Sequence, residues 1–151
     1  NSCAAYLVSA LDAVGGFPIV LTGEDTIVAS RLLSAGFLIK YVAVSEVHHS
    51  HSSTLLNEFR RHFDAGYSRN IQFKEDLLSV GNDYKKGFDY VKKFLIKTMC
   101  LNPFLVPYSL MIVVAKFTGY KLGSKAAKLP LKLKIYFSSQ DFYWTSIYYD
   151  K

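Results

Sequence analysis

Cysteine is scarce in this sequence, which holds only Cys3 and Cys100 in 151 residues. The two cysteines are far apart and lack the paired spacing of a zinc site, so a disulfide framework and a cysteine-based metal site are both disfavoured. This usage is typical of a protein in a reducing cytosol. The sequence also opens without a basic segment followed by an apolar one, so we expect no signal peptide.

Arginine is absent from residues 85–151, although this half holds twelve lysines against three aspartates, a net charge of +9. Residues 1–84 hold six lysines and arginines against nine acidic residues, a net charge of −3. Proteins that read nucleic acid usually rely on arginine for paired hydrogen bonds, whereas lysines interleaved with Phe, Leu and Tyr suit an anionic lipid surface. The charge pattern therefore predicts an anionic membrane surface as a partner, and no nucleic acid.

Apolar and aromatic residues are plentiful. Hydrophobic residues make up 50% of the chain, which contains 11 Tyr and 11 Phe, so the chain as a whole is not of the disordered class. Its length suits one compact domain with an appendage. The change of charge places the boundary: we expect a compact part over residues 1–83 and a basic, amphipathic, helical and membrane-associated extension over residues 84–151.

Two glycines and two acids stand close together near the start of the chain. Gly15 and Gly16 follow a short predicted helix, and they either end that helix or open the backbone to the close approach of another group. Glu24 and Asp25 begin a second predicted helix. The helix dipole stabilises negative charge in a first turn, so the two acids are either ordinary first-turn residues or functional ones.

Two short strands are predicted, over residues 2–8 and 37–44, and histidines follow the second one. Because side chains alternate along a strand, His49 and His51 point to one face and His48 to the other. A His-x-His pair of this kind either binds a metal ion or stands on the surface at the end of a strand.

Helices dominate the rest of the predicted structure. From residue 54, apolar residues recur at helical spacing, which predicts an amphipathic helix that covers the preceding strand. Glu58 and Asp64 lie away from the apolar face in this prediction. Further helices are predicted over residues 71–80 and 84–97.

The last third of the chain has two features that are typical of membrane interfaces. Residues 98–115 carry no charge and are flanked by lysines, so this run either lies at an interface or spans the membrane. Residues 142–149 are rich in Tyr, Phe and Trp, which favours an interfacial or docking tail.

Short motifs follow one another in a fixed order along the chain: Ala4-Ala5-Tyr6, Val14-Gly-Gly-Phe17, Gly23-Glu-Asp-Thr26, Arg31-Leu-Leu-Ser-Ala-Gly36, Tyr41, Val47-x-His49-Ser-His51, Arg61-x-Phe-Asp-x-Gly66, Gly119-Tyr-Lys-Leu-Gly123, Lys128-Leu-Pro130 and Tyr143-Trp144. Each motif alone is weak, but the ordered set is specific. With these motifs the chain resembles the C-terminal half of an inverting family 2 glycosyltransferase, most closely the bacterial rhamnosyltransferase-like members. The resemblance covers essentially the whole chain.

The resemblance implies an α/β fold class. The chain would form the C-terminal part of a GT-A fold, with short strands and the helix of the acidic motif, followed by a helix-rich, basic extension. In that family the N-terminal half binds the nucleotide and supplies an Asp-x-Asp metal motif, and no Asp-x-Asp occurs in this sequence. We therefore expect a fragment of the enzyme that is inactive by itself.

The resemblance also implies roles for individual residues. Asp25 matches the catalytic base, which removes a proton from the acceptor hydroxyl, and Glu24 is its neighbour. His49 matches a ligand of a divalent ion, Mg²⁺ or Mn²⁺, and His51 would assist it. The backbone at Gly15-Gly16 would line the acceptor site.

The implied partners of the full-length enzyme are a nucleotide-sugar donor and a saccharide or lipid-linked acceptor, with rhamnose or a similar hexose transferred in bacterial surface polysaccharide synthesis. Together with the lysine-rich half, this predicts a peripheral protein on the cytoplasmic face of a bacterial inner membrane. A fragment that loses a sheet partner exposes a strand edge, so we also expect dimers.

Two other functions are open at this stage. The first is a membrane-surface binding or scaffold module without catalysis, in which the basic aromatic tail is functional and the acids only begin a helix. The second is a zinc hydrolase that uses Asp25, His49 and His51, although the chain lacks a His-Glu-x-x-His arrangement.

Overall fold

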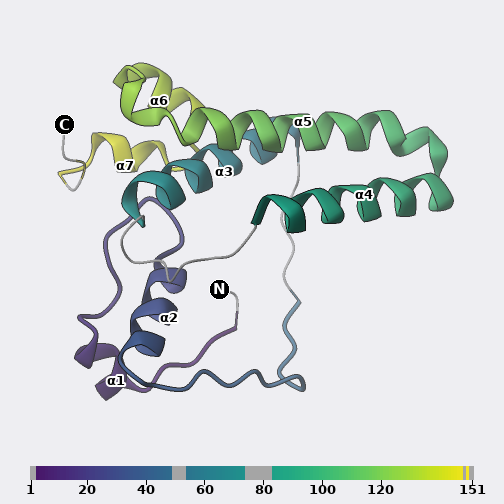
Figure 1. Cartoon of the computed structure of the whole chain (residues 1–151). Helices are drawn as coiled ribbons and strands as arrows, with labels where there is room; N and C mark the ends of the chain where they lie inside the picture. Colours follow the sequence, from purple (N-terminus) through teal and green to yellow (C-terminus); the bar gives the residue numbers. More distant parts are fainter. Residues whose placement is uncertain (1–2, 49–53, 74–82, 148, 150–151) are drawn as a thin grey trace.

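The computed structural model describes residues 3–48, 54–73, 83–147 and 149. Its elements, in chain order, are the helices α1 (Val8–Ala13), α2 (Glu24–Ser34) and α3 (Leu55–Tyr67), the π-helical segment η1 (Ser68–Gln72), α4 (Asp83–Leu101), the 3₁₀ turn η2 (Pro103–Leu105), α5 (Val106–Gly123), the 3₁₀ turn η3 (Ala126–Lys128), α6 (Leu131–Phe137) and α7 (Asp141–Thr145). Figure 1 shows α4 and α5 side by side, α3 beside α5, and the α1–α2 pair set apart from them.

Within the described residues the chain has no strand, so the strands predicted over residues 2–8 and 37–44 do not form where the structure covers them. Residues 37–44 run without regular structure, and Leu38 is 96% exposed. A strand is stable only beside a hydrogen-bonded neighbouring strand, and the described part of the chain contains no such strand. The α/β, GT-A fold class stays a prediction.

The packing of α3 against α5 is the most extensive contact between described elements. Glycines allow the two backbones to touch: Gly66 of α3 lies against the backbone of Tyr120, Gly119 of α5 against that of Phe59, and Gly123 against that of Phe63. The prediction that this helix covers the preceding strand is wrong. It covers α5 instead, because the glycine-spaced face of α5 admits a close approach.

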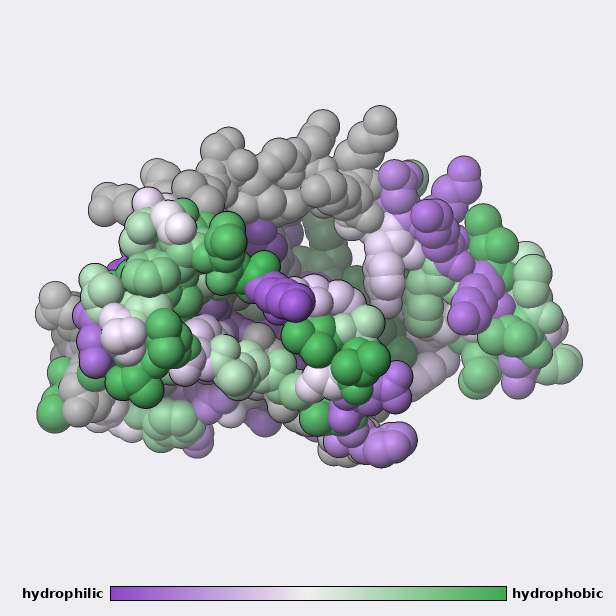
Figure 2. All heavy atoms as spheres, turned by 90° about the horizontal axis from the view of Figure 1, so that it is seen from below, coloured by the Kyte–Doolittle hydropathy of each residue, from purple (hydrophilic) through white to green (hydrophobic). Residues whose placement is uncertain are grey.

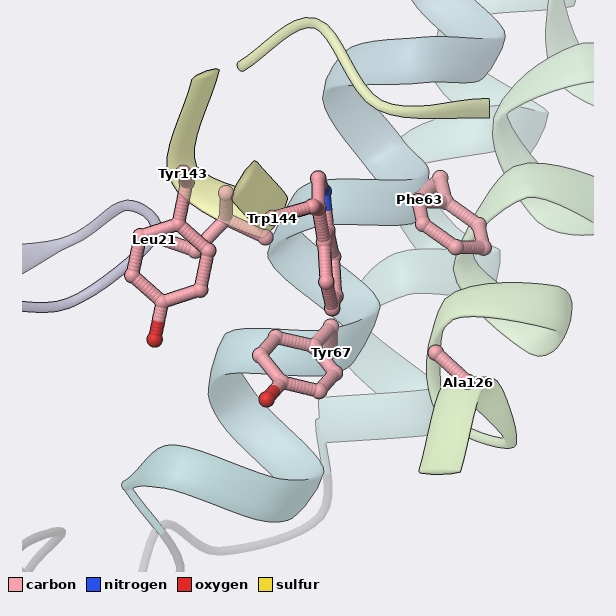
Figure 3. Packing of buried hydrophobic residues seen from close by; sticks show 6 residues of the cluster. All are labelled: Leu21, Phe63, Tyr67, Ala126, Tyr143 and Trp144. Carbon is pink, nitrogen blue, oxygen red and sulfur yellow. The ribbon is translucent and has the colours of Figure 1, made fainter. Parts of the chain in front are cut away.

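Aromatic side chains build the main core (Figure 3). Trp144 is fully buried, and its ring centroid lies 4.7 Å from that of Tyr67 and 6.4 Å from that of Phe63. The other buried members of this cluster are Leu21, Ala126 and Tyr143. Residues on both sides of the predicted boundary after residue 83 therefore share one core. The interfacial tail predicted at the aromatic end is wrong for Tyr143 and Trp144, which face inward.

Lys134 is also buried beside this core, with 7% of its surface exposed. Its Nζ donates a hydrogen bond of 2.7 Å to the hydroxyl of Tyr149 and lies 5.6 Å from the centre of the Trp144 ring. A cation over an aromatic face is stabilised by the quadrupole of the ring. One of the lysines of the basic extension is thus part of the core and is not on the surface.

The carboxylate of Asp64 ties α3 to the segment between α6 and α7. It accepts hydrogen bonds from the hydroxyl of Ser138 at 2.6 Å, from the backbone N–H of Ser139 at 2.8 Å and from the Ser139 hydroxyl. The sequence pattern placed Asp64 and Glu58 on the polar face of the helix, but both are buried. The prediction fails because each acid finds a partner from another element, Glu58 pairing with Lys116 of α5 at 3.3 Å.

Helices α4 and α5 form an antiparallel hairpin (Figure 1). The chain reverses at Asn102, whose side-chain oxygen accepts a hydrogen bond of 3.1 Å from the backbone N–H of Phe104. The helical segment Pro103–Gly123 is long and apolar enough to cross a membrane, and 11% of its apolar 18-residue window is buried. Because α4 ends at Leu101 and the chain reverses at Asn102, the uncharged run over residues 98–115 is not one straight helix.

Candidate functional site

The turn at Gly15 and Gly16 closes the C-terminal end of α1. Both glycines have left-handed backbone conformations, with φ of 81° and 74°. The N–H of Gly16 donates to the carbonyl of Leu11 at 2.9 Å, and that of Gly15 donates to Asp12 at 3.1 Å, which is the paired pattern of a Schellman motif. The helix-capping interpretation is confirmed. A Cβ at either glycine would meet no atom within 4 Å, so the turn also leaves open space beside its backbone.

The predicted helix with two acids in its first turn is confirmed as α2, which begins at Glu24. Gly23 precedes the helix in a left-handed conformation, with φ of 84°. Glu24 is exposed and Asp25 is partly buried. The negative charges lie at the positive end of the helix dipole, where charge of this sign is stabilised by about 0.3–1 kcal/mol.

The loop before α2 is held against the rest of the molecule. A Cβ at Gly23 would lie 2.8 Å from the ring of Phe73. The side-chain oxygen of Gln72 accepts from the backbone N–H of Leu21 at 3.1 Å, and its amide donates to the hydroxyl of Tyr143 at 2.8 Å. These bonds fix where the acidic turn begins. Nothing in the sequence pattern pointed to Gln72 or Phe73, since their partners are far away along the chain.

The carboxylate of Asp25 accepts a hydrogen bond from the backbone N–H of Thr26 at 2.8 Å. Burial raises the pKa of Asp25, whereas hydrogen bonds from the backbone N–H and the hydroxyl of Thr26 act to lower it. An aspartate has an ordinary pKa of about 3.9, so Asp25 is ionised at neutral pH. This is the protonation state that a general base requires before it accepts a proton.

The structure places the glycine turn and the acids in one two-helix unit, but at different positions along it. α1 packs through Ala10 on Val28, near the middle of α2, and on Leu32, in its C-terminal half. Asp25 lies in the first turn of α2, three residues before Val28 and seven before Leu32, or about 4.5 and 10 Å along the helix axis. The assignment of Gly15 and Gly16 to the acceptor site stays a prediction.

The predicted metal ligands His49 and His51 lie outside the described residues, and His48, which precedes them, is exposed. Within the ranges that the structure covers, no group of three or more His, Cys, Asp or Glu side chains is placed to hold a metal ion. The described residues do not form a metal site by themselves.

A second group of titratable side chains lies between α3 and α5. Glu58 pairs with Lys116, and the Nδ1 atom of His62 lies 2.8 Å from the backbone carbonyl of Glu58. Burial lowers the pKa of His62, although the carbonyl of Glu58 acts to raise it. This group joins two helices, so it serves the α3–α5 contact.

Two proteins from Salmonella are similar to this chain. It is 41% identical over 155 residues to the O-antigen chain rhamnosyltransferase WbaN of Salmonella anatum, with 99% of this chain and 47% of that protein covered. It is 37% identical over 155 residues to the O-antigen chain rhamnosyltransferase RfbN of Salmonella typhimurium (strain LT2), with 99% and 48% covered. The chain thus spans about half the length of these curated relatives and is related to them. No family model and no solved structure matches it.

Proposed function

We propose that this chain is the C-terminal half of a glycosyltransferase that transfers rhamnose, or a similar hexose, from a nucleotide-sugar donor to a saccharide acceptor in bacterial surface polysaccharide synthesis. The observation that carries the proposal is the similarity itself: it covers 99% of this chain at 41% and 37% identity, and both relatives are named O-antigen chain rhamnosyltransferases. The nucleotide-sugar donor would be bound by the other half of such a protein, which this chain does not include.

The proposal gives Asp25 the role of general base. Transfer with inversion is a single displacement at the anomeric carbon, so a base must take the proton of the acceptor hydroxyl on the face opposite the leaving diphosphate. Asp25 is ionised, partly buried and held in a helix turn whose start is braced by Gln72. Glu24 beside it is exposed and would orient the acceptor. These features support the assignment, because a base works only from a fixed position.

A divalent ion, Mg²⁺ or Mn²⁺, would neutralise the negative charge on the leaving diphosphate when bound to the whole enzyme. The described residues of this chain offer no set of three ligands. We therefore assign no step of the reaction to an ion held by the described residues alone, and the proposed contribution of His49 and His51 depends on ligands from the donor-binding half.

The proposal includes a GT-A fold for the whole enzyme. Residues 37–44 have the composition of a strand and are exposed without a partner in the described part of the chain. A donor-binding half that brings a sheet would supply such a partner.

A chimera tests the proposed function. The part of the Salmonella anatum relative that matches this chain is replaced by residues 1–151, and transfer of labelled rhamnose from a nucleotide-rhamnose donor is measured with membranes from a strain that lacks the relative. We expect transfer by the chimera and a loss of about 10²- to 10⁴-fold in the Asp25→Asn variant, which keeps the shape but removes the basicity. The matched control is Asp12→Asn, an exposed acid on α1, which should retain activity.

Two outcomes would count against the proposal. A folded chimera without transfer, while the parent relative is active in the same assay, would favour the binding or scaffold module. Near-normal turnover of Asp25→Asn would remove Asp25 from the role of base, although the chain would still belong to a transferase.

A further inference from the structure

Apolar side chains are exposed along the α4–α5 hairpin, whose turn lies at one end of the molecule, away from α2, α6 and α7 (Figure 1). Seen from below, hydrophobic residues gather at this end with hydrophilic ones beside them (Figure 2). Phe104 at the turn is 90% exposed and Leu101 is 76% exposed. Other exposed apolar residues of the hairpin include Leu105, Leu110, Met111 and Val114. Soluble proteins seldom leave a continuous apolar surface of this kind uncovered.

The apolar surface of the hairpin continues into a shallow groove beside α3. The groove has a volume of about 340 Å³ and is lined by Leu55 of α3 and by Leu110, Met111, Val114 and Ala115 of α5. No charged side chain lines it, so a hydrocarbon chain is a better occupant than a polar ligand.

Positive charge borders the apolar surface of the hairpin. Among the side chains that the structure describes, the exposed lysines of the hairpin are Lys92, Lys93 and Lys97 on α4 and Lys121 on α5. Residues 98–115, between them, carry no charge, and Asp89 is the one acidic residue among residues 87–123. An apolar end followed by lysines matches the order of acyl chains and anionic headgroups in a bilayer.

We propose that the α4–α5 hairpin docks on an anionic lipid bilayer, with the turn around Phe104 inserted among the acyl chains and the α4 lysines against the headgroups. This inference does not depend on the proposed function. A second copy of the chain is a poorer occupant, because it would bring two lysine-bordered surfaces together and like charges repel. Anionic headgroups complement the same charges, and their attraction falls off over a Debye length of about 8 Å at physiological salt.

The geometry points to an interfacial hairpin and not to a spanning helix. Because the chain reverses at Asn102, the uncharged part of the helical segment Pro103–Gly123 is residues 103–115, about thirteen residues or about 20 Å. The hydrocarbon core of a bilayer is about 30 Å thick. Beyond this uncharged part α3 packs against α5, and a spanning α5 would draw the Glu58–Lys116 pair into hydrocarbon. Burial of charges there is costly.

Flotation of the 151-residue chain with vesicles tests the proposal. The vesicles contain either phosphatidylcholine alone or a mixture with phosphatidylglycerol, at about 0.05 and 0.5 M salt, which shortens the Debye length about threefold. We expect binding to the anionic vesicles that weakens severalfold in high salt without disappearing. Phe104→Asp should reduce the bound fraction at least tenfold, and Leu101→Asp gives a second variant at the turn.

The matched control is Leu38→Asp, which also adds an acid at a highly exposed apolar position but lies outside the hairpin. It should bind like the parent chain. The emission of Trp144, the one tryptophan of the chain, reports whether each variant keeps the buried core. Replacement of Lys92, Lys93 and Lys97 by Gln should remove most of the salt dependence and leave the apolar part of the binding.

The depth of insertion is measured with a fluorophore on Cys100, which is exposed next to the turn, in a Cys3→Ser background. We expect quenching by lipids brominated near the headgroup end of the acyl chain and little quenching from the bilayer centre. Absence of binding to anionic vesicles at low salt would overturn the proposal. The proposal would also be overturned if Phe104→Asp converted a dimer into a monomer without changing flotation. That result would show that a second copy of the chain covers this face. Quenching from the bilayer centre with salt-independent binding would show a spanning helix.

Discussion

The close contact between α3 and α5 leads to a prediction about glycine that sequence composition alone would not suggest. An ideal Cβ at Gly123 would lie 2.8 Å from the carbonyl carbon of Phe63 and 3.0 Å from its Cα, and closer still to the carbonyl oxygen. These are backbone atoms of a helix, so no side-chain rotation relieves the clash. The two helices must move apart by about an ångström, because atoms in good contact are about 3.5–4 Å apart.

Two opposing effects decide the magnitude for Gly123→Ala. Alanine is favoured over glycine in a helix by about 1 kcal/mol. Overpacking of a well-packed core costs about 1–3 kcal/mol, and a rigid backbone contact belongs at the upper end of this range. Separation of the helices also loosens Phe63, which is fully buried beside Trp144. We expect a net loss of about 2 kcal/mol, a large share of a typical folding free energy of about 5–15 kcal/mol.

The assay is urea unfolding followed by the emission of Trp144 and by circular dichroism. Gly87→Ala is the matched control, because Gly87 lies in α4 and a Cβ there would meet no atom within 4 Å. This variant should gain about 0.5–1 kcal/mol from helix propensity alone. A Gly123→Ala protein as stable as Gly87→Ala would refute the backbone contact. Gly119→Ala, with a Cβ 3.1 Å from the carbonyl carbon of Phe59, provides a second test at the same crossing.

Further predictions concern two buried titratable groups and metal binding. Burial raises the pKa of Tyr67 from 10.0 to about 12, and the neighbouring tyrosines act in the same direction, so the folded chain keeps this proton to a higher pH than the unfolded chain. Unfolding measured at increasing pH should show about 2–3 kcal/mol of stability lost between about pH 10 and 12, and less loss in Tyr67→Phe. Asp64→Ala should cost about 2–4 kcal/mol at pH 7, since the hydroxyl of Ser138 and the N–H of Ser139 lose their acceptor. Burial raises the pKa of Asp64 above 3.8. The stabilisation that comes from protonated Asp64 should therefore be complete below about pH 4 and be lost as the pH rises through the pKa of the folded state. The Asp64→Asn variant should not show this pH dependence of the unfolding free energy. Calorimetry with Mg²⁺ or Mn²⁺ should show weak or no binding to residues 1–151, since these ions prefer oxygen-rich shells, and tight binding would contradict the need for ligands from a second half.

The helix ends could be predicted from the sequence because they depend on neighbouring residues. Gly15 closes α1 and the acids at 24 and 25 open α2 as predicted, and Thr54, at the predicted start of the third helix, caps α3 by accepting from the N–H of Asn57 at 3.1 Å. Each of these features joins groups within about five residues, so the local sequence contains all the interacting partners. The order of motifs also pointed to a rhamnosyltransferase relative, which the similarity to the Salmonella proteins supports.

Contacts between distant parts of the chain decided the rest. The helical period alone assigns a charged residue to the surface, but Asp64 finds Ser138 and Ser139 more than seventy residues later and becomes buried. Lys134 likewise enters the core because Tyr149 and Trp144 receive it. Residues 37–44 have the composition of a strand, yet a strand forms only where another strand supplies hydrogen bonds. By composition alone, residues 98–115 could either span a membrane or lie at its interface. The reversal of the chain at Asn102 and the packing of α3 on α5 favour the interface. The length of a straight apolar segment depends on where the chain turns and on what packs against it, and only the tertiary structure shows both.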